Sequence, residues 1–572
     1  MDIEADQDNK SDRKNSVQSV NDAHDLAILG HVEELTRKFD PWSMLALAFS
    51  ILGTWSTLAV GLSSGLANGG PVSILWGFIV VFICNICIAL SLGELCSAMP
   101  TALGQAYYIH RLFDTPIGRF SSYMCAWINT FGWWTLTASQ AAFMTEFMLG
   151  MKVMFDTEWS GAGKGWVQFL VYLGVILAFT AANVVACRKD KILPIFNDVI
   201  GLWYIALFFM ISLALLISVG TRDGMSFQPA SFVFGGWLNG TGWPTGVVWF
   251  TGLLQGAYAL TAFDAVIHMI EELPEPRKNA PRIAWLAVSL GAATGWIFMV
   301  VCLFCIQDLE TVIDGPTGLP FSDLVLQTIG RTGSCVLLSL LVVNGLGQAV
   351  SMATTGSRLT WGFARDAGIP WSGYFSKVDP FWKVPARALW LQGALIALVG
   401  ILYLFANTVL EAIFSVATIA LTISYGMPIL ALVLAGRDKL PPGGTFKLGK
   451  LGPLCNWVSV IYCSITTVFF FFPGEPNPAP ADMNYAIAVF GVMLVISLAF
   501  WVIKARRTYL KSDDAAMRIE LARELEQREL VNPIIETQKP VVILSVPAGV
   551  RSIGGEQDPG MAGSGLMRRR EK

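Results

Sequence analysis

The stretch ALTAFDAVIHMIEELPEPRKNAP, residues 259–281, begins as an apolar helix and then contains four ionisable side chains in the nine residues 264–272. Spacings of four and eight residues place Asp264, His268 and Glu272 along one face of a helix, with Glu271 beside them. At the centre of a membrane-spanning helix a carboxylate costs about 2.5–3.5 kcal/mol on insertion scales, so it should face protein or water. We expect either a site at which Asp264 binds an amine or a proton, or a structural ion pair with another helix.

The composition places this stretch in a membrane protein. The chain has 572 residues, of which 54% are hydrophobic and 14% are charged, with a mean hydropathy of +0.56. Soluble domains carry about 25% charged residues. Uncharged runs of about 20 residues, each long enough to cross a bilayer as a helix, predict twelve spans. They are 44–66, 72–98, 121–149, 167–186, 193–219, 247–270, 283–306, 334–360, 388–405, 410–435, 454–472 and 485–503.

The distribution of lysine and arginine predicts the orientation of the spans, because short cytoplasmic loops collect these residues. With the N-terminus inside, only four cations of the loops lie outside: Lys152, Lys164, Arg222 and Arg331. The cytoplasmic loops then hold Arg111, Arg119, Arg188, Lys189, Lys191, Arg277, Lys278, Arg282, Arg358, Arg365, Lys377, Lys383, Arg387, Arg437, Lys439, Lys447 and Lys450. We therefore expect both termini in the cytoplasm, and tails at 1–43 (disordered) and 504–572.

Enzyme, metal and cofactor functions find no support in the residue patterns. The four histidines lack metal-ligand spacing, and the ten cysteines lie almost entirely inside the predicted spans, as small packing residues do. No phosphate-binding loop, nucleophile elbow or paired catalytic carboxylates occur. We expect no enzyme, no cofactor and no nucleic-acid partner. Asn239-Gly240-Thr241, in a predicted outer loop, is a glycosylation sequon or a chance occurrence.

The first and sixth predicted spans share an interruption near their middle. Glycine and polar residues occur at 53–56 in the first span (Gly-Thr-Trp-Ser) and at Gly256, Thr261 and Asp264 in the sixth. Broken helices are tolerated at membrane depth where they line a cavity, and their free backbone groups can bind ligands. The alternative is that small residues simply permit close helix packing. The matched positions favour a pair of broken helices.

Three stretches resemble a known family of permeases. They are ANGGP followed by SLGELCSAMPTALGQAYY (67–71, 91–108), AFDAVIHMIEELPEPRKNAP (262–281) and TTGSRLTWGFARDAGIPWS (354–372). The chain resembles the amino acid/polyamine/organocation superfamily, most closely its fungal amino acid/choline transporter branch. The resemblance implies an all-α integral membrane fold of the LeuT-like type, with twelve transmembrane helices. Two inverted five-helix repeats would occupy 44–219 and 247–435, and two extra helices would occupy 454–503.

The same resemblance implies a substrate site at the two helix breaks. The residues that match are Gly53, Thr54 and Trp55 in the first helix and Thr261, Ala262, Phe263 and Asp264 in the sixth. A substrate carboxylate would meet a half-helix N-terminus, and an ammonium would meet carbonyl ends, Asp264 or an aromatic face. The aromatic candidates are Trp55, Trp133, Trp134 and Tyr258. For each ring, packing in the core or against lipid is the alternative.

Charged residues near the predicted cytoplasmic surface suggest an inner gate. Arg358, Arg365 and Asp366, together with Glu94, Glu271 and Glu272, could form ion pairs that break when the site opens inward. The alternative for the arginines is anchoring at the membrane surface.

The sequence therefore predicts a multi-pass permease, in the plasma membrane or the vacuole with the plasma membrane favoured. It would import an amino acid or a small amine such as choline or 4-aminobutyrate by alternating access. Coupling to protons is expected, with sodium left open because Thr354 and Thr355 could contribute to an ion site. Partners are the substrate, the coupling proton and membrane lipid. The alternatives are a nutrient sensor that does not transport, and a membrane-embedded enzyme.

Overall fold

The computed structural model describes residues 35–510, apart from 188–190, 314, 380, 382–383, 405–408, 480–482 and 484. Every regular element in these ranges is a helix, and a single β-bridge joins Asn68 to Asn239. The all-helical fold class is therefore confirmed for the described residues. The predictions for 1–34 and 511–572, and for the cations at 188, 189 and 383, lie outside them.

Helices of the first half follow the predicted spans closely. They are α2 (Pro41–Leu52), α3 (Thr54–Val60), α4 (Leu62–Ala67), α5 (Gly70–Val72), η1 (Ser73–Gly77), α6 (Phe78–Ala98), α7 (Gln105–Leu112), α8 (Pro116–Phe155), α9 (Gly165–Ala186), α10 (Ile192–Thr221) and α11 (Ala230–Gly235). The helix α2 begins where Asp40 accepts hydrogen bonds from the backbone N–H groups of Trp42 and Ser43, which otherwise lack partners at a helix start.

The second half adds the following helices: α12 (Thr245–Ala259), α13 (Ala265–His268), η2 (Ile270–Glu272), α14 (Pro276–Cys305), α15 (Leu309–Ile313), α16 (Pro320–Ile329), α17 (Arg331–Arg365), α18 (Ser372–Phe375), α19 (Ala386–Val399), η3 (Gly400–Leu404), α20 (Val409–Ala435), η4 (Arg437–Lys439), η5 (Gly449–Leu451), α21 (Gly452–Phe469), α22 (Ala486–Phe500), η6 (Trp501–Ala505) and α23 (Arg506–Thr508).

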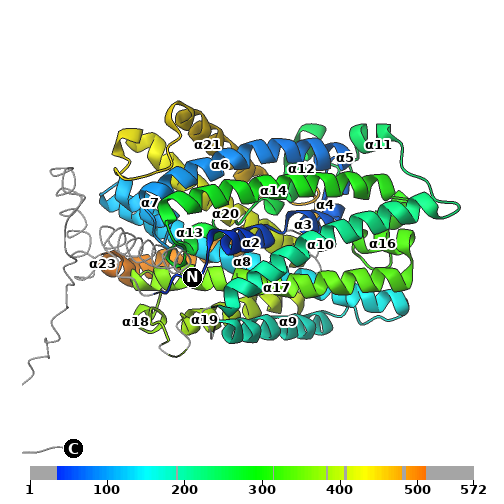
Figure 1. Ribbon diagram of the computed structural model, residues 1–572, viewed down its shortest axis with the longest axis horizontal. Helices are drawn as coiled ribbons and strands as arrows, with labels where there is room; N and C mark the ends of the chain where they lie inside the picture. Colours follow the sequence, from blue (N-terminus) through cyan, green and yellow to red (C-terminus); the bar gives the residue numbers. More distant parts are fainter. Residues whose placement is uncertain are drawn as a thin grey trace, which may run out of the picture. The chain divides into compact units, whose positions relative to one another are not determined.

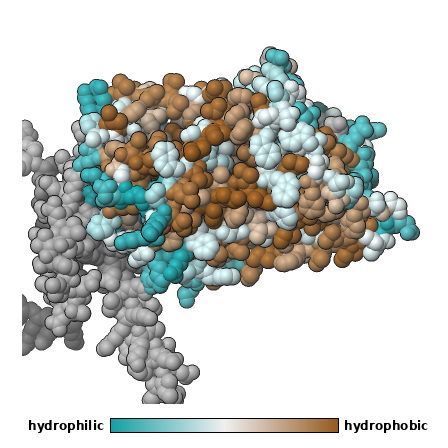
Figure 2. Space-filling model, turned by 90° about the horizontal axis from the view of Figure 1, so that it is seen from above, coloured by the Kyte–Doolittle hydropathy of each residue, from teal (hydrophilic) through white to brown (hydrophobic). Residues whose placement is uncertain are grey.

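Ten helical runs of the described chain are long and apolar enough to cross a membrane. The surface agrees with this: Figure 2 shows hydrophobic residues over the middle of the visible face and hydrophilic residues toward both ends. Large apolar side chains such as Val199, Leu202 and Phe209 on α10 are more than half exposed. The predicted third and sixth spans, α8 and the α12–α13 pair, are not among the ten. α12 has only 15 residues, and α8 carries many polar side chains.

Helix α8 forms the centre of the bundle and packs against α17, α20 and α7. Around it, α14 packs against α6 and α2, and α2 also packs against α10. In Figure 1 the helices α7, α18 and α23 lie at one end of this bundle, whereas α11 and α16 lie at the other. Helices beside the cation-rich loops, which are predicted to be cytoplasmic, therefore lie at the same end of the bundle.

Two helices are interrupted inside the bundle, at the predicted places. Gly53 separates α2 from α3 in the left-handed conformation, with φ 53° and ψ 30°. Glycine adopts this region without the steric cost that a Cβ atom brings. The helix α12 ends at Ala259, and regular structure resumes only at Ala265. Between them Ala262 has φ 79°, a rare conformation for a residue with a side chain.

Candidate functional site

The interruption after α12 brings Asp264 to the centre of a buried polar cluster. Its side chain is fully buried and has four hydrogen-bond partners. Oδ1 accepts from Tyr425 Oη at 2.7 Å, and Oδ2 accepts from Gln105 Nε2 at 2.8 Å and Trp133 Nε1 at 3.3 Å. The fourth partner is His268 Nε2, 3.0 Å from Oδ2. Such bonds stabilise a buried carboxylate and leave little room for a substrate amine on it.

The hydrogen bonds of His268 define where its protons lie. Nδ1 is 2.9 Å from the carbonyl oxygen of Ala102, which can only accept, so Nδ1 carries a proton. Nε2 faces both Asp264 Oδ2 at 3.0 Å and Asn129 Nδ2 at 3.2 Å. The contact between Nε2 and Oδ2 therefore needs one proton, on the imidazole or on the carboxyl.

Two glutamates follow in the 3-10 turn η2, after α13 has ended at His268, and each forms a buried ion pair with α17. Glu272 Oε1 accepts from Arg358 Nε at 2.8 Å, and both side chains are 1% exposed. Glu271 accepts from both terminal nitrogens of Arg365, at 3.0 and 3.3 Å. We call these two contacts the double ion pair. They join α17 to the segment after α13.

Glu94 lies apart from the double ion pair. Its carboxylate accepts from Arg437 Nη2 at 2.5 Å and from the backbone N–H of Leu448 at 2.9 Å. Because Arg437 follows α20, this contact ties α6 to the segment between α20 and α21. The role of Glu94 in a gate stays a prediction, and its observed partner is different from those of Glu271 and Glu272.

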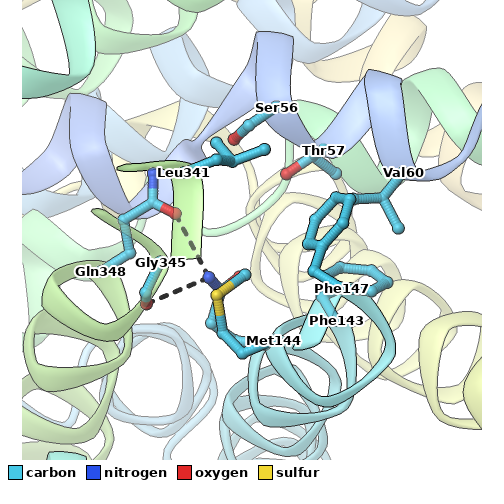
Figure 3. Close-up of a pocket in the computed structure, with 10 residues that line it drawn as sticks. Ser56, Thr57, Val60, Phe143, Met144, Phe147, Leu341, Gly345 and Gln348 are labelled. Atoms are coloured by element: carbon cyan, nitrogen blue, oxygen red, sulfur yellow. Dashed lines mark hydrogen bonds between the residues drawn. The ribbon is translucent and has the colours of Figure 1, made fainter. Parts of the chain in front are cut away.

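A small cavity lies beside the first helix break, between α3, α8 and α17. Figure 3 shows Ser56, Thr57 and Val60 on one side and Phe143 and Phe147 on another. The remaining lining residues are Gln140, Met144, Leu341, Gly345 and Gln348. The lining contains hydroxyls, amides and aromatic rings, and no charged side chain. The free space is about that of one water molecule, so side chains must move before a larger ligand enters.

Two carboxamides cross this cavity. Gln140 Nε2 donates to Gln348 Oε1 at 3.3 Å and to the carbonyl oxygen of Gly345 at 3.2 Å, as the dashed lines in Figure 3 show. Gln348 Nε2 has no hydrogen-bond partner although it is buried. It lies close to the break, since a Cβ atom on Gly53 would be 3.2 Å from it. An unpartnered buried donor at this point could bind an oxygen of a ligand.

The side chains of Thr54 and Trp55 point away from this cavity. The Trp55 ring is fully buried, stacks on Tyr204 of α10 at 4.8 Å and also contacts Phe298 of α14. Thr54 lies against α14, where a Cβ atom on Gly291 would be 2.4 Å from its hydroxyl oxygen. Substrate contact by Thr54 and Trp55 stays a prediction.

The remaining aromatic and polar candidates are also held by protein contacts. Trp134 Nε1 donates to Thr360 Oγ1 at 3.1 Å. Tyr258 Oη is 2.5 Å from Ser139 Oγ, and its ring lies 4.1 Å from that of Phe414. Tyr258 thus bridges α12 and α8 near the cavity.

The second break is held through Tyr425 of α20. The backbone N–H of Ala262 donates to Tyr425 Oη at 3.1 Å, and the Phe263 ring lies 5.0 Å from the Tyr425 ring. Thr261 Oγ1, which lies just after α12, donates to the carbonyl oxygen of Ala257 in the last turn of that helix at 2.6 Å. Tyr425 therefore stabilises both the strained backbone and Asp264.

The sequon at Asn239 lies in an exposed turn after α11. Asn239 Oδ1 accepts from both the backbone N–H and the hydroxyl of Thr241, and Nδ2 donates to the carbonyl oxygen of Trp243 at 2.9 Å. Glycosylation of Asn239 stays a prediction.

Sequence reasoning missed four members of the site: Gln105, Asn129, Gln348 and Tyr425. Gln105 lies in the GQAYY stretch that carried the family resemblance, which was a usable signal. Asn129, Gln348 and Tyr425 are polar residues inside predicted spans, a weaker signal because such residues also bond to their own helix.

Comparisons with known proteins agree with this architecture. The sequence model of the family described as amino acid permease matches residues 39–495. The choline transporter of Saccharomyces cerevisiae is 30% identical over 479 residues, which cover 83% of each chain. A Macrophomina phaseolina protein, named as a candidate amino acid/polyamine transporter, is 32% identical over 450 residues, or 78% of this chain and 97% of its own. The amino-acid permease BAT1 of Arabidopsis thaliana is 26% identical over 498 residues, covering 85% and 95%.

Proposed function

The chain belongs to the amino acid permease family, and from that premise we propose that it is a proton-coupled importer of an amino acid or a small amine such as choline. The observation that carries this proposal is the cavity beside the interruption at Gly53, together with the pair of Asp264 and His268 at the second interruption, which we call the proton-holding pair. A cavity for the substrate and a titratable pair for the ion are the two sites that coupled transport needs.

We propose that the substrate binds in the cavity of Figure 3 after it widens. Its carboxylate or hydroxyl would accept from Gln348 Nε2 and from hydroxyls of α3. Its ammonium would lie against aromatic rings, since the lining has no carboxylate. Gly53, Thr54, Trp55, Thr261, Ala262 and Phe263 would shape the two breaks, with Trp134 and Tyr258 beside them.

Asp264 is proposed for the proton rather than for the amine. Its four hydrogen-bond partners would each have to be displaced before an ammonium could reach it. The proton that it shares with His268 needs no displacement. We further propose that the double ion pair closes the path to the cytoplasm and opens during alternating access.

The proposed fold has twelve spans in two inverted five-helix repeats, at 44–219 and 247–435, with two further helices at 454–503. Both termini would be cytoplasmic and the membrane would be the plasma membrane. Single cysteines at Gly224 and Asp438, both exposed, test the orientation on a cysteine-free background. A membrane-impermeant maleimide added to intact cells should label the first and reach the second only after permeabilisation. Labelling of both in intact cells would contradict the topology.

Uptake by the whole protein tests the function. We would measure accumulation of labelled choline, 4-aminobutyrate and single amino acids in cells or proteoliposomes with an inward proton gradient. Accumulation of one of them above its external concentration, abolished by a protonophore and insensitive to replacement of sodium, is expected. Uptake that depends on sodium would reject the proton as the coupling ion. Absence of uptake for every substrate, with the protein correctly inserted, would favour a sensor that does not transport.

A further inference from the structure

One short loop and the residue that follows it contact three of the four ionisable side chains between 264 and 272. The loop comprises residues 99–104, between α6 and α7, and leads directly into Gln105 at the start of α7. Gln105 Nε2 donates to Asp264 Oδ2 at 2.8 Å. The carbonyl oxygen of Ala102 accepts from His268 Nδ1 at 2.9 Å, and the N–H group of Ala102 donates to Glu271 Oε1 at 3.3 Å. The loop therefore bonds the proton-holding pair and one half of the double ion pair together.

The conformation of Gly104 allows the loop to approach so closely. Its φ of 56° and ψ of −121° lie in a region that other residues avoid. A Cβ atom at this position would be 2.7 Å from Ile267 Cγ2 and 3.4 Å from His268 Cε1. Any larger residue would push the loop away from the segment 264–272. The close approach thus depends on glycine.

Loss of the shared proton changes one contact of His268 and preserves the other. Nδ1 keeps its proton and its bond to Ala102 in every state that the geometry allows. Without the shared proton, the lone pair of Nε2 faces Oδ2 of Asp264 across 3.0 Å, and the contact becomes repulsive. We expect this repulsion to displace the imidazole, and Ala102 to move with it because it stays bonded to Nδ1. Asn129 remains as a donor to Nε2.

We propose that the loop 99–105 transmits the protonation of the Asp264–His268 pair to the double ion pair, with Gln105 and Ala102 as positioning residues. The inference rests on the proposed proton coupling. When the pair holds its proton, the loop supports Glu271 in its bond with Arg365. When the proton leaves, displacement of Ala102 withdraws a hydrogen bond from Glu271 and favours opening.

Other titratable groups face the pair from three neighbouring helices. They are Tyr425 of α20, Tyr108 of α7 and Cys125 of α8. Tyrosine and cysteine are ordinarily neutral in the range in which histidine titrates. The charged groups beyond the pair are those of the double ion pair. The Asp264–His268 pair is therefore the member of this cluster that shares a proton across a hydrogen bond.

The coupling between the proton and the double ion pair acts in both directions, and this sets the order in which the proton leaves and the inner path opens. If proton loss favours an open double ion pair, then an open double ion pair must hold the proton less tightly. The proton would be retained while the inner path is closed and released once it opens to the cytoplasm. Import driven by a proton gradient needs this order of events.

Cys187 offers a native reporter of opening. It is 1% exposed at the end of α9 and interacts with both Arg358 and Glu272. On a background in which the other cysteines are replaced, we would measure its maleimide labelling in inside-out vesicles between about pH 5 and about pH 8. Each rate is divided by that of a free thiol at the same pH, because maleimide reacts with the thiolate. This ratio should be about tenfold higher at the alkaline end, the factor that one hydrogen bond to a charged group supports.

Gln105→Leu should abolish this pH dependence at unchanged expression. The substitution removes one hydrogen bond, because Gln105 Oε1 has no partner. Gln168→Leu is the matched control: it removes a similar carboxamide bond, to the carbonyl oxygen of Ala162, on the distant helix α9. The control should keep the pH dependence. A Gln105→Leu protein that keeps it as well would overturn the transmission role.

Two further outcomes separate this inference from the proposed function. Proton-driven uptake combined with labelling of Cys187 that ignores pH would leave the function intact and reject the inference. Uptake without proton dependence would reject the function itself. If Gln105→Leu does not fold, Gln105→Asn keeps the amide and withdraws it from Asp264. Failure of both to fold, while Gln168→Leu folds, would assign Gln105 a structural role and reject transmission.

Discussion

Replacement of Asp264 by asparagine separates charge from shape at the centre of the site. An asparagine with its oxygen in the place of Oδ2 can still accept from Gln105 and Trp133. Its NH₂ group then faces Tyr425 Oη, a hydroxyl that can accept instead of donate. Three contacts therefore survive, whereas the contact with His268 is lost together with the charge and the shared proton, because Nε2 of a neutral His268 with its proton on Nδ1 is an acceptor.

The cost to stability follows from the hydrogen bonds. Bonds to charged groups contribute about 1.5–3 kcal/mol and neutral ones about 0.5–1.5 kcal/mol, so each of the three retained bonds weakens by about 1 kcal/mol, and the lost contact with His268 adds about 1 kcal/mol. A loss of about 4 kcal/mol is tolerable for a protein with a typical stability of about 5–15 kcal/mol. Asp264→Ala would instead leave three buried donors without an acceptor, at about 1–3 kcal/mol each. We expect Asp264→Asn to reach the membrane and Asp264→Ala to fail.

The assay is the ratio of internal to external substrate in energised cells. One proton moving across about 100 mV is worth about 2.3 kcal/mol, or about fiftyfold accumulation. With Asp264→Asn this ratio should fall to about one, while exchange of internal for external substrate continues. If the variant still accumulates substrate and responds to a protonophore, Asp264 does not hold the coupling proton. A variant that does not fold would support a structural ion pair instead.

Three further substitutions test other parts of the site. Trp55→Phe should lower the melting temperature and leave the apparent affinity nearly unchanged, because the ring stacks on Tyr204 and its N–H group has no partner. Ala262→Gly should leave the melting temperature unchanged or raise it, since it relieves a left-handed conformation that costs about 1–2 kcal/mol. Glu272→Gln should lower stability by about 3–5 kcal/mol or hold the protein open inward, because Arg358 is left buried without its counter-charge.

Each of these has a control or a contradicting result. A changed substrate ranking in Trp55→Phe would show that the ring reaches the substrate. A lower melting temperature in Ala262→Gly would show that the lost methyl group outweighs the strain. For Glu272→Gln the control is Asp156→Asn, which breaks the exposed pair with Lys152 and should change little. Equal effects of the two substitutions would contradict the importance of burial.

The helix breaks were predictable because their signals are local. Glycine and hydroxyl residues inside an apolar run disfavour a continuous helix wherever the segment packs, and both breaks occur at the predicted positions. The residues that bond to the predicted charged side chains could not be predicted from the sequence in this way. Gln105 and Tyr425 lie 159 and 161 residues from Asp264 along the chain. A one-dimensional pattern carries no information about such contacts, so the fourfold bonding of Asp264 was not expected.

The sequence also could not predict which neighbouring helices the side chains at the first break would face. Successive residues of a helix rotate by about 100°, so Thr54 and Trp55 face α14 and α10 whereas Ser56 and Thr57 face the cavity. Choosing between these faces requires the neighbouring helices. The partner of Glu94 was unpredictable for the same reason, because Arg437 lies 343 residues away along the chain.

The double ion pair explains why the segment 264–272 carries so many charges in an apolar bundle. Breaking either buried pair in a dry interior would leave two uncompensated charges, which is prohibitively costly. Opening therefore requires water to reach Glu271 and Glu272 as they separate from α17. In the proposed mechanism the same water would reach toward His268, which lies one turn away and would then release its proton to solvent. Inner opening, hydration and proton release would be one event, and the proton would not leak while the path is closed.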